Sequence, residues 1–474
     1  MLRHKAKSAV FWNTIELLVR VGAGFVVTVI LARLLAPDDF GVLALLALFL
    51  GIANLFANAG FSAALIQRQD VTHADESTVF WFNILMALLM MLALFAIAPW
   101  IASFFEMPLL QPLTMVMAIN VLIGAAGAVQ IALLTKQLDF KTLTKVTVFS
   151  TVISGVVSIY MAVAGYGVWA LAAQSITATL IATLLLWHLS AWRPLSKFKR
   201  DSFRRLFGFG GWMFASSLLE TIYQRGYTLL IGKSYGTYDL GIYSQAERVQ
   251  QIPSGVLTEV LSRVAFPLFS SVNDDNEKLA RGVRTSVRNM MLIVAPVMFG
   301  LAVLAVPFID AVFGEKWLPA APILQILCIV GLLFPLQVIN LTALQAQGHS
   351  KLFFQLEVAK KITGVALLIG GSFFGIVGIA WSRVIQSVLA LLINAHYTKR
   401  FLDYGVFKQL ADCFASILLS AAMTVVIMTV DSWTSVGGIT GLVLLIVVGA
   451  GFYLGSGLLL RLSVFREAFQ LLRK

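Results

Sequence analysis

Nine ionisable residues interrupt stretches of the chain that are otherwise apolar, and their types point to one kind of chemistry. They are five arginines and four glutamates: Arg20, Arg225, Arg248, Arg263 and Arg383, with Glu16, Glu220, Glu247 and Glu259. Guanidinium groups hold phosphates through paired hydrogen bonds and stay charged when desolvated. Because the arginines outnumber the acids by one, the set favours an anionic ligand. We therefore predict a cationic cavity for a pyrophosphate or an acidic sugar, with the five arginines as its substrate-binding residues.

The spacing of these residues indicates which of them can neutralise a neighbour. Glu16 and Arg20 are four apart with the acid first, so they share a helix face and can equally well neutralise each other. Glu220 and Arg225 are five apart, about 140° around a helix at 100° per residue, and pair poorly within it. Arg383 has no acid on its own apolar stretch, although its side chain can snorkel toward the nearer end. Arg225 and Arg383 are therefore the stronger ligand candidates.

The segment 242–268 carries a polar stripe. At 100° per residue, an arc of about 120° contains Ser244, Gln245, Arg248, Gln251, Gly255, Glu259, Ser262 and Arg263. Polar residues of this kind also serve as simple packing contacts between helices in membranes. We assign the polar lining and gating of the cavity to Glu16, Asn54, Asn58, Glu220, Gln251, Glu259 and Ser262. No catalytic residue and no metal ligand is predicted.

The elements that position these residues are predicted to be membrane-spanning helices. Of the 474 residues, 59% are hydrophobic and 12% are charged, whereas soluble domains have roughly 45–50% and 25%. Apolar runs of about 20 residues can cross a bilayer. They predict fourteen helices, near 10–35, 41–66, 78–102, 111–134, 146–164, 167–189, 208–232, 242–268, 289–311, 321–344, 362–374, 376–397, 412–430 and 438–460. The expected fold class is an all-α polytopic membrane protein.

The basic residues predict how the chain is oriented. The net charge of +12 comes from 35 Lys and Arg against 23 Asp and Glu. If fourteen helices span the membrane, the terminal segments and every second loop lie on the same side. Most of the 35 basic residues fall in these parts of the chain, Lys360 and Lys361 among them. The positive-inside rule then places both termini in the cytoplasm. Since the charge follows topology, we exclude nucleic acid as a partner.

An internal repeat divides the chain. At an offset of 200, Gly41 matches Gly241 and Asp39 matches Asp239, and farther along the offset drifts to about 210. Apolar helices with similar loops can also look alike by chance. We predict a six-helix lobe over 1–206, a second over 207–400 and a terminal two-helix segment with a cytoplasmic tail over 401–474. An even number of helices in each lobe gives both the same orientation, related by a pseudo-two-fold axis along the membrane normal.

Motifs for other chemistry are missing from the sequence. It contains no glycine-rich loop ending in Lys-Ser/Thr, no His-Glu-x-x-His and no Cys-x-x-Cys, which argues against ATP hydrolysis and metal catalysis. Cys328 and Cys413 lie in apolar runs and are expected to be buried. The short outer loops argue against an enzyme.

Three segments resemble one family of exporters. They are ILARLLAPDDFGVLAL from Ile30 to Leu45, FGEKWLPAAPILQIL from Phe313 to Leu327, and NLTALQAQGHSK from Asn340 to Lys351. They are similar to the Wzx-type branch of the multidrug/oligosaccharidyl-lipid/polysaccharide exporter superfamily, and most of all to its colanic-acid-exporter-like members. The resemblance implies a MATE/MurJ-like fold with a V-shaped cavity that opens alternately to each side of the bacterial inner membrane.

The resemblance also implies a function. It is the export of undecaprenyl-pyrophosphate-linked oligosaccharide for exopolysaccharide, capsule or O-antigen synthesis, without a cofactor. The implied partners are that lipid-linked sugar, membrane lipids, and the polymerase and co-polymerase of the same pathway. A multidrug or cation antiporter of the same superfamily and a membrane-embedded polymerase or ligase are the alternatives. Coupling stays open, because Glu16, Glu220 or Glu259 can titrate, sodium can bind, or substrate gradients can suffice.

Overall fold

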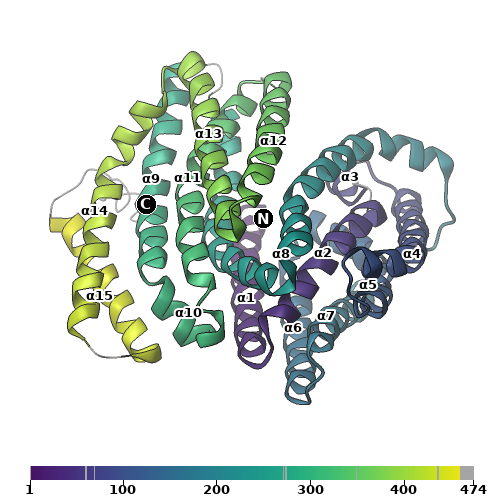
Figure 1. Ribbon diagram of the computed structural model, residues 1–474. Coiled ribbons are helices and arrows are strands. Elements are labelled where there is room, and N and C mark those ends of the chain that lie inside the picture. Colours follow the sequence, from purple (N-terminus) through teal and green to yellow (C-terminus); the bar gives the residue numbers. More distant parts are fainter. Residues whose placement is uncertain are drawn as a thin grey trace. The chain divides into compact units, whose positions relative to one another are not determined.

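The computed structural model describes residues 2–58, 61–68, 70–270, 272, 275–348, 350–434 and 437–459, all of whose longer elements are helices (Figure 1). The first half contains α1 (Leu2–Leu34), α2 (Pro37–Asn58), α3 (Phe61–Gln67), α4 (His73–Phe104), α5 (Leu110–Lys136), α6 (Phe140–Val163) and α7 (Val168–Leu189). The long α8 (Arg200–Ser270) is followed by α9 (Asn276–Val303), α10 (Ala305–Phe313), the 3-10 turn η1 (Glu315–Trp317) and α11 (Ala320–Ala346). The last helices are α12 (Ser350–Ser372), α13 (Gly375–Leu402), α14 (Val406–Trp433) and α15 (Gly438–Leu459).

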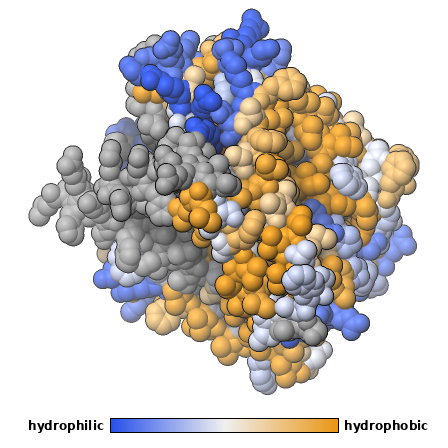
Figure 2. Space-filling view, turned by 90° about the vertical axis from the view of Figure 1, so that its left-hand side faces the viewer, coloured by the Kyte–Doolittle hydropathy of each residue, from blue (hydrophilic) through white to orange (hydrophobic). Residues whose placement is uncertain are grey.

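The prediction of an all-α polytopic membrane protein is confirmed. Ten of the described helices are long and apolar enough to cross a bilayer: α2, α4, α5, α6, α7, α9, α11, α13, α14 and α15. Exposed apolar side chains such as Phe414, Leu418 and Val447 suit contact with lipid, and Figure 2 shows a broad apolar area on one face. Each of the fourteen predicted spans overlaps a helix, but the count of fourteen is not confirmed, because α1, α8 and α12 are outside the ten.

The 71-residue α8 consists of two helical segments that meet at Gly236. Gly236 has φ +87° and ψ −178°, a backbone conformation that favours glycine. The two predicted spans 208–232 and 242–268 are the two segments. At an offset of 200, Gly236 corresponds to Ala36, which lies in the turn between α1 and α2. The repeat in the sequence therefore has a counterpart in the positions of the helix breaks.

The two segments that begin at Pro37 and Thr237 touch through their backbones. A β-carbon added to Gly41 would lie 1.9 Å from the Thr237 carbonyl oxygen, and one added to Gly241 would lie 2.0 Å from the Pro37 carbonyl oxygen. Thr237 also donates a hydrogen bond from its hydroxyl to Asp38 Oδ1 at 2.8 Å. The contact is reciprocal at an offset of 200, which is the signature of a local two-fold axis.

The described residues form two compact units, Met1–Gly241 and Ile242–Lys474. In the first unit α4 packs on α5, α6 packs on α7, and α2 contacts α4, α5 and α7. In the second unit α11 lies between α9 and α13, α12 packs on α13, and α14 packs on α9 and α15 (Figure 1). The lobe boundaries at 206 and 400 stay predictions.

Polar contacts attach α14 to the rest of the second unit. The side-chain amides of Asn340 and Gln409 are both fully buried and bond reciprocally at 2.9 and 2.8 Å. At the start of α14, Asp412 accepts two hydrogen bonds of 2.7 Å from Arg284 and one of 3.0 Å from the Tyr404 hydroxyl. These bonds join α9, α11 and α14.

The segment 190–199, which leads into α8, is fastened to the first turns of α4. The Trp192 indole donates to Glu76 at 2.7 Å, and the Lys199 amide donates to the Thr78 hydroxyl at 3.1 Å. The buried carboxylate of Asp75 accepts both bonds of the Arg205 guanidinium. The position of the beginning of α8 is therefore set by α4.

The start of α12 differs from the predicted span. The predicted span began at 362, whereas α12 begins at Ser350, which places Lys360 and Lys361 inside the helix instead of in a loop. At 1.5 Å per residue, Lys360 lies about 15 Å from the N-terminal end of α12. The charged residues lower the hydropathy of the first half of this helix, so the hydropathy pattern does not indicate that half.

Candidate functional site

The ion pair between Arg383 and Glu247 is the centre of the candidate site in the second unit. Arg383 on α13 donates through Nη1 to Glu247 Oε1 and to the Tyr243 hydroxyl, the latter at 3.5 Å. Tyr243 and Glu247 are one turn apart on α8, so a single turn of α8 provides both acceptors. The Arg383 and Glu247 side chains are partly buried, at 23% and 28% exposure. Spacing along one helix cannot pair Arg383 with Glu247, because the two lie 136 residues apart.

The polar stripe on the second segment of α8 is only partly exposed in the structure. Arg248 and Gln251 are exposed as the stripe predicts, and Gln251 donates from Nε2 to Glu247 Oε1 at 3.2 Å. Gln245 is instead buried, at 3% exposure. Three predicted residues, Glu259, Ser262 and Arg263, lie on α8 where the side chains are outside the described residues.

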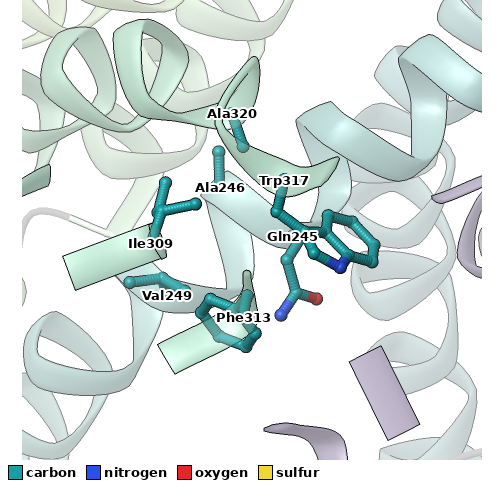
Figure 3. A pocket seen from close by; sticks show the side chains of 7 residues that line it. All are labelled: Gln245, Ala246, Val249, Ile309, Phe313, Trp317 and Ala320. Atoms are coloured by element: carbon teal, nitrogen blue, oxygen red, sulfur yellow. The ribbon is translucent and has the colours of Figure 1, made fainter. Parts of the chain in front are cut away.

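Gln245 lines a small pocket between α8, α10, η1 and α11 (Figure 3). The pocket is formed by Gln245, Ala246, Val249, Ile309, Phe313, Trp317 and Ala320. Its largest side chain, Trp317, belongs to the motif beginning at Phe313 and is fully buried. The amide nitrogen of Gln245 is buried without a hydrogen-bond partner among the described atoms. This motif therefore packs the η1 turn against α8, which is a structural role.

Residues predicted on α1 and α2 make local contacts in the first unit. Arg20 Nε lies 3.1 Å from Glu16 Oε1, so the ion pair expected from their spacing is present. Asn54 donates to the Leu50 carbonyl at 2.9 Å, and Asn58 donates to the Asn54 carbonyl at 3.0 Å. Asn54 is exposed, which leaves its amide oxygen accessible.

Arg225 lies beside Gly51, a position of α2 that carries no side chain. A β-carbon at Gly51 would come within 3.7 Å of Arg225 Nε, and the guanidinium therefore occupies space that a larger residue at 51 would restrict. Glu220 accepts a hydrogen bond of 2.7 Å from Gln224. Arg20 and Arg225 belong to the first unit, and Arg248 and Arg383 to the second.

Sequence reasoning missed a second charged group on the same face of α13. Lys360 on α12 forms an ion pair with Glu357 and donates to Asn394 Oδ1 on α13 at 3.3 Å. Gln337 on α11 continues the network by donating to Ser387 Oγ at 2.6 Å. The Lys360 side chain is only 11% exposed. The spacing of Glu357 and Lys360 by three residues was the available signal.

Neither a metal site nor a disulfide is found among the described residues. These residues contain no group of three or more His, Cys, Asp or Glu that could hold a metal ion. Both cysteines are buried as free thiols, as their apolar surroundings predict. What the arrangement offers is guanidinium groups within apolar helices, and carboxylates hold two of them, those of Arg20 and Arg383. This chemistry suits the binding of an anion.

Known proteins resemble this chain along most of its length. A family model described as "Polysaccharide biosynthesis protein" matches residues 30–322. The teichuronic acid biosynthesis protein TuaB of Bacillus subtilis (strain 168) is 34% identical over 389 residues, which cover 79% of this chain and 78% of TuaB. The succinoglycan biosynthesis transport protein ExoT of Rhizobium meliloti (strain 1021) is 27% identical over 380 residues. The match covers 80% of this chain and 77% of ExoT.

A solved structure shares the fold. The lipid II flippase MurJ in an inward closed conformation superposes with a TM-score of 0.77 and 16% identity, covering 95% of this chain and 99% of MurJ. At this identity the likeness concerns the arrangement of helices.

Proposed function

This chain belongs to the polysaccharide biosynthesis protein family, and on that premise we propose that it is a flippase. It moves an oligosaccharide linked to undecaprenyl pyrophosphate across the bacterial cytoplasmic membrane by alternating access. The observation that carries the proposal is the likeness to TuaB and ExoT over about four-fifths of the chain. The names of these relatives place TuaB in teichuronic acid biosynthesis and ExoT in succinoglycan biosynthesis and transport.

The structure supports this proposal in a second way, through the chemistry of the helices. Arg225 and Arg383 are partly exposed, and Arg248 is exposed, on helices that also carry polar residues. A pyrophosphate group needs such donors in an otherwise apolar setting. We further propose that both termini lie in the cytoplasm, as the distribution of lysine and arginine indicates, and that the polymerase of the pathway receives the exported sugar.

The decisive experiment measures on which side of the membrane the lipid-linked sugar accumulates. Cells that lack this protein are treated with a glycosidase or label that acts only from outside. We expect the sugar to be protected in these cells and to become accessible after re-expression. Unchanged sidedness with shortened or missing polymer would favour a polymerase or ligase. Unchanged sidedness and normal polymer, with altered drug resistance, would favour an antiporter.

The arginines of the proposed cavity are tested one at a time. Hydrogen bonds to charged groups contribute about 1.5–3 kcal/mol, so Arg225→Ala, Arg248→Ala and Arg383→Ala should each lower export at least tenfold while membrane insertion stays normal. Lysine at the same positions should rescue export partly, since it keeps the charge but not the planar donor pair. The control is Arg281→Ala, which removes an exposed arginine from the first turns of α9. Equal export by all three alanine variants would contradict a cationic cavity.

A further inference from the structure

Glu247 accepts a hydrogen bond from a donor atom of Arg383, Nη1, that an anionic substrate could also use. Its carboxylate accepts from Arg383 Nη1, and the Tyr243 hydroxyl accepts from the same nitrogen at 3.5 Å. A phosphate binds a guanidinium through the same kind of charge-assisted hydrogen bonds. An anion that added to Arg383 with Glu247 in place would bring two negative groups to one cation, and they would repel each other. The carboxylate and the anion therefore compete.

The ion pair between Glu247 and Arg383 is built differently from two other pairs, each of which lies along a single helix. Glu16 and Arg20 are paired along one helix, and so are Glu357 and Lys360. Glu247 and Arg383 instead join α8 to α13. When this pair separates, a charged contact between two helices is lost, so a ligand that breaks it acts on the packing of those helices as well as on the charge.

Glu247 has a second donor beside it. Gln251, one turn farther along α8, donates to the same Oε1 atom at 3.2 Å and is itself exposed. After Arg383 turns to a ligand, the carboxylate keeps this hydrogen bond and is not left without a donor. The Glu247 side chain is also 28% exposed and so is not fully enclosed by the protein.

We propose that Glu247 is a displaceable carboxylate, which holds Arg383 until the anionic group of the substrate takes its place and which expels that group when the pair forms again. Glu247 is then a positioning residue that acts through Arg383 and governs release. The inference rests on the proposed function, because it takes the pyrophosphate of the lipid-linked sugar as the competing anion. A ligand shifts the contact between α8 and α13 only by its differential affinity for the open pair.

The test separates binding from export. Inorganic pyrophosphate is titrated calorimetrically into the full chain, purified in detergent, for the parent and for Glu247→Gln. The glutamine keeps the size of the side chain and removes its charge, so we expect pyrophosphate to bind more tightly, on the order of tenfold, while export in cells falls because release is slowed. Damage to the structure would lower both quantities.

Further variants show whether the tighter binding comes from the lost charge of Glu247 and acts through Arg383. Glu247→Asp keeps the charge and should bind pyrophosphate as the parent does, whereas adding Arg383→Ala to Glu247→Gln should remove the gain. Asp403→Asn is the matched control: it removes an exposed carboxylate, which pairs with Lys408 just beyond α13, and should leave binding unchanged. Binding by Glu247→Gln that is equal to or weaker than that of the parent would overturn the proposal, and so would a lack of measurable binding by both proteins.

The two proposals fail in distinguishable ways. Tighter binding of pyrophosphate by Glu247→Gln, together with unchanged sidedness of the sugar in cells that lack the protein, would contradict the flippase and support the displaceable carboxylate with another anionic cargo. Altered sidedness with no gain in binding would support the flippase and overturn the role of Glu247.

Discussion

Gly41→Ala should strongly destabilise the protein, although alanine ordinarily favours a helix. The added β-carbon would stand 1.9 Å from the Thr237 carbonyl oxygen, far inside the roughly 3.5–4 Å at which non-bonded atoms attract. The carbonyl oxygen belongs to the backbone and the β-carbon is attached directly to it, so neither atom can rotate away from the other. We expect a loss of stability at or above the upper end of the roughly 1–3 kcal/mol typical of overpacking. Gly241→Ala meets the Pro37 carbonyl at 2.0 Å and should behave alike.

Thermal unfolding in a mild detergent, followed by the fraction of monodisperse protein, measures this effect. Gly124→Ala is the matched control, because its β-carbon would only touch the Thr179 methyl group at 3.6 Å. It should gain about 0.5–1 kcal/mol from the lower entropy of the unfolded chain. If Gly41→Ala and Gly124→Ala unfold at the same temperature, the close contact at Gly41 is wrong.

Lys360→Met should strongly destabilise the second unit. It leaves the Glu357 carboxylate inside the unit without its cation, and removing one partner of a buried pair costs about 3–5 kcal/mol. We expect the lower end of this range, because Glu357 is 25% exposed. The double variant Lys360→Met/Glu357→Met should recover most of the loss, since apolar residues of similar size often replace a buried pair at little cost.

The same unfolding measurement, made on the two single variants and the double variant, gives the coupling energy of the pair. Lys399→Met is the control, because it removes the same charge from an exposed position near the end of α13 and should change stability by less than about 0.5 kcal/mol. A double variant as unstable as the sum of its single variants would show that the two charges do not stabilise each other.

The sequence predicts the helices well wherever lipid faces them. A run of about 20 apolar residues has few alternatives in a bilayer, because every backbone polar group must be bonded within the segment. The prediction fails at the start of α12, where Glu357 and Lys360 neutralise each other through a contact that hydropathy does not register. It succeeds at the two segments of α8, because residues 233–239 are polar and contain Gly236.

The candidate site is predictable only as far as its contacts are local. The pair Glu16–Arg20 follows from helix geometry alone, and the structure contains it. The partner of Arg383 comes from another helix, and the burial of Gln245 depends on Trp317, 72 positions later in the sequence. Such tertiary contacts depend on how helices pack, which a single sequence does not encode in its periodicity. Binding of substrate by the predicted arginines stays a prediction.

The reciprocal contact of Gly41 and Gly241 bears on how such a chain can have arisen. In a dimer of two identical half-length chains, one glycine codon would supply both sides of the axis, and a single mutation there would introduce two clashes at once. Fusion of the two copies into one gene separates the codons, so each half can then drift on its own. The two halves differ over most of their length, whereas Gly41 and Gly241 are the same residue in both, and at each of them a side chain would meet the backbone of the other segment.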